Sequence, residues 1–144
     1  MPPIYTVDAS VFLNPFARAE VGHTDSARFL AYLEAEAAPI VVPTLVITEV
    51  AAAIGRSQRD PVLALEAAAG VGRLDHLSLI ALDVRLAEEA ARVAATHRLR
   101  GSDAVYAAVA LRFGATLVTR DREQRERLDP VLNARSPEQV LGAS

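Results

Sequence analysis

Short apolar runs alternate along this chain with longer stretches of mixed hydrophobic and polar character. The runs are rich in β-branched residues and end at turn-forming residues, which is typical of buried strands. They occupy residues 4–7, 40–42, 77–82 and 115–119. Between them, apolar residues recur with helical spacing and stop at proline or glycine, which predicts helices over residues 24–37, 44–54, 61–70, 83–97 and 101–114.

The segments outside these elements carry weaker signals. We expect a loop after Asp8, and either Thr24 or Asp25 as the cap of the first helix. Ser136 and Gln139 have the spacing of a capping box, which predicts a final capped turn.

Strands that alternate with helices favour a mainly parallel sheet. No linker or repeat interrupts the alternation, so we predict a single domain over residues 1–144. Its class is α/β, with three layers and a central sheet flanked by helices. About half of the 144 residues are apolar, which is ample for one core.

Composition excludes several kinds of protein. The chain has no cysteine, which excludes disulfides, thiolate metal sites and a cysteine nucleophile. No apolar run is long enough to span a bilayer, and Met1-Pro2-Pro3 does not begin a signal peptide. We therefore expect a cytoplasmic protein without membrane attachment.

The formal charge of −3 argues against a nucleic-acid partner, but the charge is unevenly distributed. All 15 basic residues are arginine, and residues 92–127 hold eight of them against four acids. This region is therefore locally basic, while the remainder of the chain is acidic.

Three acidic residues stand alone in apolar surroundings. Asp8, Glu49 and Asp103 are each the only charged residue in a long window. A carboxylate that is buried without a partner is costly and has a raised pKa, so we expect a cation beside each one. The windows cover residues 1–17, 37–55 and 101–111.

The predicted fold brings these acids together. Asp8 and Asp121 each follow a strand and lie at the carboxyl edge of a parallel sheet, where α/β folds bind ligands. Asp103 falls in the first turn of a helix, and Glu49 in the helix after the second strand. Four converging carboxylates suit Mg²⁺ or Mn²⁺ as hard oxygen ligands.

Each acid alone also has a simpler interpretation. Asp103 can favour the positive end of its helix, Asp8 can stabilise a turn, and Asp121 can cap a helix. Glu49 is harder to explain in this way, because no basic residue lies one helical turn away. The four together are a stronger signal than any one of them.

At these residues the chain resembles the PIN domain family, and within it the VapC-type toxin ribonucleases of toxin–antitoxin pairs. The similar segments occur in the family's order over nearly the whole chain, and the most specific of them lies 18 residues before Asp121. The segments are Tyr5-Thr6-Val7-Asp8-Ala9-Ser10, residues 44–50 with Glu49, Gly101-Ser102-Asp103-Ala104-Val105-Tyr106-Ala107-Ala108, and Thr116-Leu117-Val118-Thr119-Arg120-Asp121.

The resemblance implies an Mg²⁺- or Mn²⁺-dependent endoribonuclease that forms a homodimer and is silenced by a cognate antitoxin. It places the family's catalytic, metal-binding acids on Asp8, Glu49, Asp103 and Asp121. It also places a supporting hydroxyl on Thr119 and a small polar residue on Ser10. Whether one metal ion binds or two stays open, and residues 54–74 match nothing that identifies the RNA or the antitoxin.

Such a site must hold RNA despite its own negative charge. Arg120, Arg122 and Arg125 lie beside or just after Asp121, so they are candidates for binding RNA phosphates through bidentate contacts. The alternative for these arginines is a solvated helix face with internal ion pairs.

Four other functions compete with the toxin hypothesis. A haloacid-dehalogenase-like phosphatase requires a second aspartate two positions after Asp8, where this chain has Ser10. A receiver domain requires a late lysine, and the chain has none. A housekeeping PIN nuclease without an antitoxin stays possible, as does an inactive PIN fold that only binds RNA or protein.

Overall fold

The computed structural model describes residues 2–13 and 22–143. Its centre is a sheet of five strands, all parallel, in the order β3-β2-β1-β4-β5. The strands are β1 (Tyr5–Val7), β2 (Ile40–Pro43), β3 (Leu77–Ile80), β4 (Thr116–Val118) and β5 (Ala134–Arg135). The helices are α1 (Ala9–Leu13), α2 (His23–Ala35), α3 (Leu45–Gln58), α4 (Pro61–Gly72), α5 (Val84–His97), α6 (Gly101–Phe113), α7 (Arg122–Leu128) and α8 (Pro137–Ala143).

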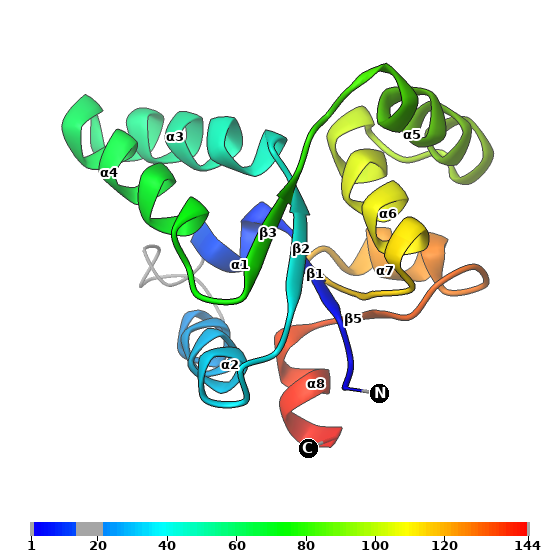
Figure 1. Ribbon diagram of the computed structural model, residues 1–144, viewed down its shortest axis with the longest axis horizontal. Helices are drawn as coiled ribbons and strands as arrows, with labels where there is room; N and C mark the ends of the chain where they lie inside the picture. Colours follow the sequence, from blue (N-terminus) through cyan, green and yellow to red (C-terminus); the bar gives the residue numbers. More distant parts are fainter. Residues whose placement is uncertain (1, 14–21, 144) are drawn as a thin grey trace.

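The helices cover both faces of the sheet. Figure 1 shows the sheet almost edge-on, with α2, α3 and α4 to its left and α5, α6 and α7 to its right. This arrangement confirms the predicted three-layer α/β class with a parallel sheet. Within the described part of the chain, no helix is both long and apolar enough to cross a membrane.

The middle of α6 is part of the core. Seven consecutive residues of α6, from 104 to 110, are buried, so this helix is enclosed on all sides. Four of the seven are alanine, which lets α6 lie close to the strands. The first turn of α6, which holds Asp103, is thereby fixed relative to β1 and β4.

Several predicted helix ends are confirmed by side-chain caps. Asp83 Oδ1 accepts a 2.9 Å hydrogen bond from the backbone N–H of Leu86 at the start of α5. Ser136 and Gln139 form the reciprocal pair of the predicted capping box, with N···O distances of 3.2 and 2.8 Å, and this turn continues as α8.

Other local predictions were wrong. The expected loop after Asp8 is the short helix α1, and Gly22 precedes α2 in place of a Thr24 or Asp25 cap. The helix α3 runs through Gly55 to Gln58, because one interior glycine costs a helix only about 1 kcal/mol.

The sheet also contains one strand that the apolar runs did not predict. The additional strand, β5, has two residues, which is too short to produce an apolar pattern of its own. It pairs with β4 and extends the sheet by one edge strand.

Candidate active site

Asp8 lies at the end of β1, where three polar groups contact its carboxylate. Its backbone N–H donates to the carbonyl of Val118 on the neighbouring strand β4, which fixes its position at the sheet edge. The hydroxyl of Ser10 donates to Oδ2 at 2.6 Å, and the Ser10 backbone N–H reaches the same oxygen at 3.3 Å. The hydroxyl of Thr119 lies 3.2 Å from Oδ2. Both hydroxyls expected to support the site thus contact Asp8.

The environment of Asp8 disfavours its negative charge. Only 8 % of the residue is exposed. Burial raises the pKa of its carboxyl, and the charge of Asp103 raises it further, while the hydrogen bonds from Ser10 and Thr119 lower it. The rise due to burial is the largest effect, so ionised Asp8 calls for a cation close by.

Thr119 connects Asp8 with the loop that holds Asp121. Its fully buried side chain lies at the end of β4. Its hydroxyl oxygen is 2.8 Å from Gln124 Oε1 and accepts a 3.2 Å hydrogen bond from the Asp121 backbone N–H. Asp121 in turn caps α7, because its Oδ1 accepts from the Gln124 backbone N–H at 3.2 Å.

An arginine lies between two of the acidic residues. Arg100 immediately precedes α6, and its Nε donates to Asp103 Oδ2 at 3.1 Å. Its Nη2 donates to Asp121 Oδ2 at 3.3 Å. The Arg100 side chain is 78 % exposed, whereas that of Asp103 is 14 % exposed. The guanidinium therefore covers the carboxylates from the solvent side.

Glu49 reaches the site from α3. The hydroxyl of Tyr106, a fully buried residue of α6, donates a 2.6 Å hydrogen bond to Glu49 Oε1. Burial raises the pKa of Glu49, and the charges of Asp8 and Asp103 raise it further. The Tyr106 hydrogen bond and the charge of Arg100 lower it.

The four carboxylates thus gather at the carboxyl edge of the sheet. Asp8, Glu49 and Asp103 interact electrostatically with one another, and Asp121 joins them through Arg100. Among the residues described, no three acidic or imidazole side chains lie close enough together to form a metal-binding cluster. The donor set is nevertheless all carboxylate oxygen, which fits Mg²⁺ or Mn²⁺ and not a softer metal ion.

An open hollow lies beside Arg100. Its volume is about 250 Å³, and it is large enough to admit a phosphate group. It is lined by Leu99, Arg100, Asp103, Asp121, Glu123, Gln124 and Arg127. Arg127 contacts Glu123 and the carbonyl of Arg98.

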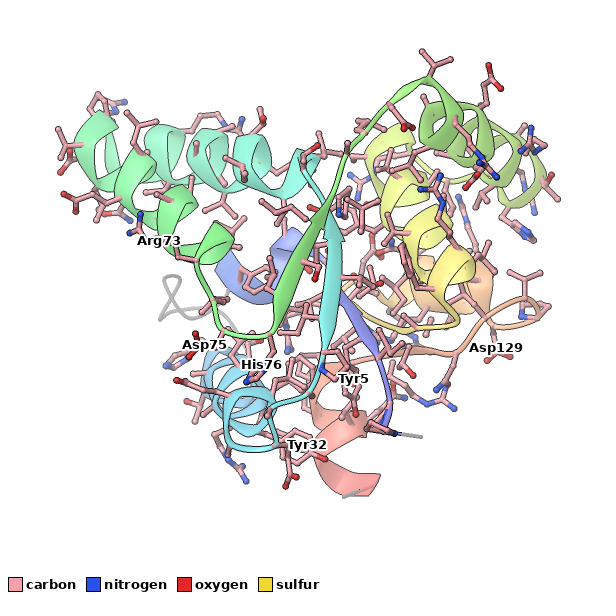
Figure 2. All side chains as sticks on the ribbon, in the orientation of Figure 1. Tyr5, Tyr32, Arg73, Asp75, His76 and Asp129 are labelled. Atoms are coloured by element: carbon pink, nitrogen blue, oxygen red, sulfur yellow. The ribbon has the colours of Figure 1, made fainter. Side chains whose placement is uncertain are left out.

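The opposite end of the sheet carries a different set of polar groups. Tyr5, Tyr32, Asp75 and His76 lie around the starts of the strands, near α2 (Figure 2). Asp8 follows the other end of β1, so these labelled residues do not contribute to the acidic cluster.

The candidate RNA-binding arginines differ in their contacts. Arg120 turns away from the acidic cluster: its Nη1 contacts Glu138 at 2.6 Å and Ser26 at 3.2 Å, so it ties α8 to α2. Arg122 forms an exposed ion pair with Glu126 at 2.9 Å. Arg125 Nη1 donates to the Thr119 carbonyl at 2.8 Å. Of the three, Arg122 is the most exposed, with 83 % of its side chain accessible to solvent.

The sequence reasoning missed three contacts of this site. Arg100 stands three positions before Asp103, and that i,i+3 spacing was a usable signal for an ion pair. Tyr106 and Gln124 carried no comparable signal, because their partners Glu49 and Thr119 come from other elements.

The profile of the PIN domain family matches residues 5–128. No curated protein sequence matches the chain significantly.

Solved structures share the fold at low sequence identity. A protein of Pyrobaculum aerophilum is 24% identical with a TM-score of 0.69, over 98% of this chain and 88% of that one. VapBC2 of Rickettsia felis, bound to a promoter DNA fragment, is 15% identical with a TM-score of 0.69, over 92% and 98%. VapC20 of Mycobacterium tuberculosis, a toxin that cleaves the sarcin–ricin loop, is 20% identical with a TM-score of 0.68, over 85% and 93%.

Proposed function

Because the chain belongs to the PIN domain family, we propose that it is a metal-dependent endoribonuclease and the toxin of a toxin–antitoxin pair. The observation that carries this proposal is that four carboxylates, including that of Asp8, gather at the carboxyl edge of the sheet. Hydrolysis of an RNA phosphodiester bond needs an activated water molecule, neutralisation of charge on the phosphate and stabilisation of the leaving oxygen.

In this proposal Asp8, Asp103 and Asp121 are the ligands of Mg²⁺ or Mn²⁺. A divalent ion held there lowers the pKa of water and acts as a Lewis acid on the phosphate. Ser10 and Thr119 orient Asp8, so that its Oδ1 is left to face the site while Oδ2 is held by hydroxyls.

Glu49 is proposed as the proton acceptor for the attacking water. Its pKa is raised by burial and by the neighbouring carboxylates, which moves it towards the pH at which a general base works best. Tyr106 holds one of its oxygens, so the other oxygen can point at the water.

The RNA strand is proposed to lie along the basic region beside α7. Arg122 can exchange its exposed ion pair with Glu126 for a phosphate at little cost, because exposed pairs contribute little stability. Arg125 is proposed as a second phosphate contact. Arg120 is not retained in this role, because Glu138 and Ser26 hold its guanidinium elsewhere.

The partner proposal rests on relatives of the same fold. The Rickettsia felis structure is a VapBC assembly, and another similar structure is a toxin–antitoxin complex from Klebsiella pneumoniae. By analogy we propose a cognate antitoxin and a homodimer for this chain, acting on RNA in the cytoplasm. We also propose that residues 1–144 form one domain, which the single continuous core supports.

The nuclease proposal is tested by RNA cleavage with purified protein and Mg²⁺ or Mn²⁺. We expect Asp8→Asn and Asp103→Asn each to lower the cleavage rate by about 100-fold or more, because each removes a charged metal ligand. Asp75→Asn is the matched control, since this exposed aspartate lies at the other end of the sheet. Equal cleavage by the wild type and both site variants would exclude the metal-nuclease function.

The toxin proposal has a separate test. Expression of the wild-type chain in a bacterial host is expected to stop growth, and co-expression with the product of an adjacent small gene is expected to restore it. Cleavage activity without growth arrest would point to a housekeeping nuclease instead.

A further inference from the structure

Arg100 makes two ion pairs that converge on the proposed metal ligands. Its Nε lies 3.1 Å from Asp103 Oδ2, and its Nη2 lies 3.3 Å from Asp121 Oδ2. Asp103 belongs to the first turn of α6, and Asp121 caps α7. One guanidinium thus bridges two carboxylates from separate elements, as a divalent cation shared by the same two residues would do.

The Arg100 bridge also reduces the repulsion among the surrounding carboxylates. Asp8 and Glu49 also interact with the charge of Arg100, so a single guanidinium faces four carboxylates. Without a cation, the mutual repulsion of these carboxylates would push Asp103 and Asp121 apart. Arg100 therefore supplies positive charge to the acidic site in the metal-free protein.

The bridge is also built so that it can open. The Arg100 side chain is 78 % exposed, and ion pairs in contact with water add little to stability. The guanidinium can leave through solvent without disturbing the core, whereas the 14 % exposed Asp103 cannot follow it. Asp103 therefore stays in place when another cation takes the position of the guanidinium.

From these contacts we propose that Arg100 is an internal counter-ion of the acidic site, which exchanges with the divalent cation for Asp103 and Asp121. The inference rests on the proposed function, since it takes the same aspartates as metal ligands. Arg100 and the metal ion bind in alternation, so Arg100 sets the metal concentration at which the site fills. It also keeps Asp103 and Asp121 together while no metal is bound.

The test measures Mn²⁺ binding to the full chain by titration calorimetry, without RNA. Arg100→Gln removes the competing charge, and we expect its dissociation constant for Mn²⁺ to be about threefold to tenfold lower than that of the wild type. Arg100→Lys keeps the charge but lacks the planar fork that bridges both aspartates, so its dissociation constant is expected to lie between those of the wild type and Arg100→Gln. Without metal, Arg100→Gln is expected to have a lower melting temperature, and Mn²⁺ is expected to raise it by more than in the wild type.

Arg127→Gln is the matched control. Arg127 lines the same hollow, but its guanidinium contacts Glu123 and the Arg98 carbonyl instead of the site aspartates. Removing its charge changes the local field without opening the Arg100 bridge, so its Mn²⁺ affinity is expected to change by less than about twofold.

A direct readout comes from NMR of the wild type with Mg²⁺, which is diamagnetic. The Arg100 Nε–H signal is identified by its absence from the spectrum of Arg100→Gln. In the wild type this signal is expected to shift as Mg²⁺ is added, and the midpoint of the shift should equal the midpoint of Mg²⁺ binding.

The outcomes separate this inference from the function on which it rests. If the wild type binds Mn²⁺ and Arg100→Gln binds it equally or more weakly, the exchange is wrong and the metal site stands. If Arg127→Gln gains as much Mn²⁺ affinity as Arg100→Gln, the exchange is also overturned. The loss of any nearby positive charge would then explain the gain. If the wild type does not bind Mn²⁺ at all, both proposals fail.

Discussion

The hydroxyl of Tyr106 donates a 2.6 Å hydrogen bond to Glu49 Oε1, and so joins two residues that are 57 positions apart in the chain. Tyr106 lies on the enclosed helix α6 and is fully buried, while Glu49 enters the site from α3. Burial and the neighbouring Glu49 raise the pKa of Tyr106, so the phenol stays protonated and remains a donor at neutral pH.

Removal of this hydroxyl tests the role of Glu49. In Tyr106→Phe the ring still fills its space, but Glu49 loses the hydrogen bond that lowers its pKa, so this pKa rises. We expect the rate of RNA cleavage at neutral pH to fall about tenfold, in line with the loss of one hydrogen bond to a charged group. The acidic limb of the pH–rate profile should move to higher pH. Tyr32→Phe, at the other end of the sheet, is the control and should leave the pH–rate profile unchanged. If the profile is also unchanged in Tyr106→Phe, the role of Glu49 as general base is contradicted.

Ionised Asp8 is expected to destabilise the metal-free protein. Its pKa is raised in the folded state, so between the ordinary and the raised value the folded protein binds more protons than the unfolded chain. The contribution of Asp8 to stability therefore falls as the pH rises through this window. Asp8→Asn removes the titration, and its free energy of unfolding should exceed that of the wild type at neutral pH but not at low pH.

The measurement is denaturation of metal-free protein at a series of pH values. Asp75→Asn serves as the control for the loss of one carboxylate, because Asp75 is exposed at the other end of the sheet and should not reproduce the gain in stability of Asp8→Asn. A stability gain of Asp8→Asn that does not depend on pH would show that packing, and not charge, causes it.

The buried hydroxyl of Thr119 should stabilise the fold as well as the site. Thr119→Val keeps the shape but leaves the Asp121 backbone N–H and Gln124 Oε1 without their Thr119 partner. We expect a loss of about 1–3 kcal/mol in unfolding free energy, which is the usual cost of unsatisfied buried polar groups. Thr116→Val on the same strand, whose hydroxyl accepts one exposed hydrogen bond from Asn133, should lose clearly less in the same urea titration. Equal losses would mean that the Thr119 contacts add nothing specific.

Substitution of Arg120 should affect stability, whereas substitution of Arg122 should affect RNA binding. Arg120 has a side chain only 20 % exposed between α2 and α8, so Arg120→Gln should lower the unfolding free energy by about 1–2 kcal/mol. Its RNA affinity should stay near that of the wild type. Arg122→Gln should leave stability within about 0.5 kcal/mol but weaken RNA binding and reduce the salt dependence by about one counter-ion.

Binding is best measured by fluorescence anisotropy at several salt concentrations, in the cleavage-deficient Asp8→Asn background. A reversal, with Arg120→Gln weakening RNA binding and Arg122→Gln weakening the fold, would return Arg120 to the RNA-binding surface.

The sequence pattern predicted the elements whose signals are local. β1, β2, β3 and β4 each begin within one residue of the start of an apolar run. For β1, β2 and β4 the reason is that a buried parallel strand is apolar on both faces, whereas the edge strand β3 is only partly buried. The helix α1 was missed because it begins only two residues after the end of β1 and its five residues are too few to show a helical period. β5 is shorter still and owes its pairing to β4.

The candidate site divides in the same way. The positions of Asp8, Glu49 and Asp103 could be predicted because a lone charge in an apolar window requires a reason. Their partners could be predicted only where they are close in sequence, as Arg100 is to Asp103. Tyr106 and Glu49 meet only because α6 and α3, which lie on opposite sides of the sheet, are both positioned by the tertiary fold. No local sequence pattern encodes that contact.

The strand order also bears on how the protein is made. β1 is the middle strand and pairs with β4, so the ribosome must synthesise more than a hundred residues between the two partners. A polypeptide that ends before β4 lacks Asp121, and its β1 has no β4 to hold Asp8 at the sheet edge. The proposed site therefore cannot assemble during synthesis until β4 and Asp121 have both been added to the chain.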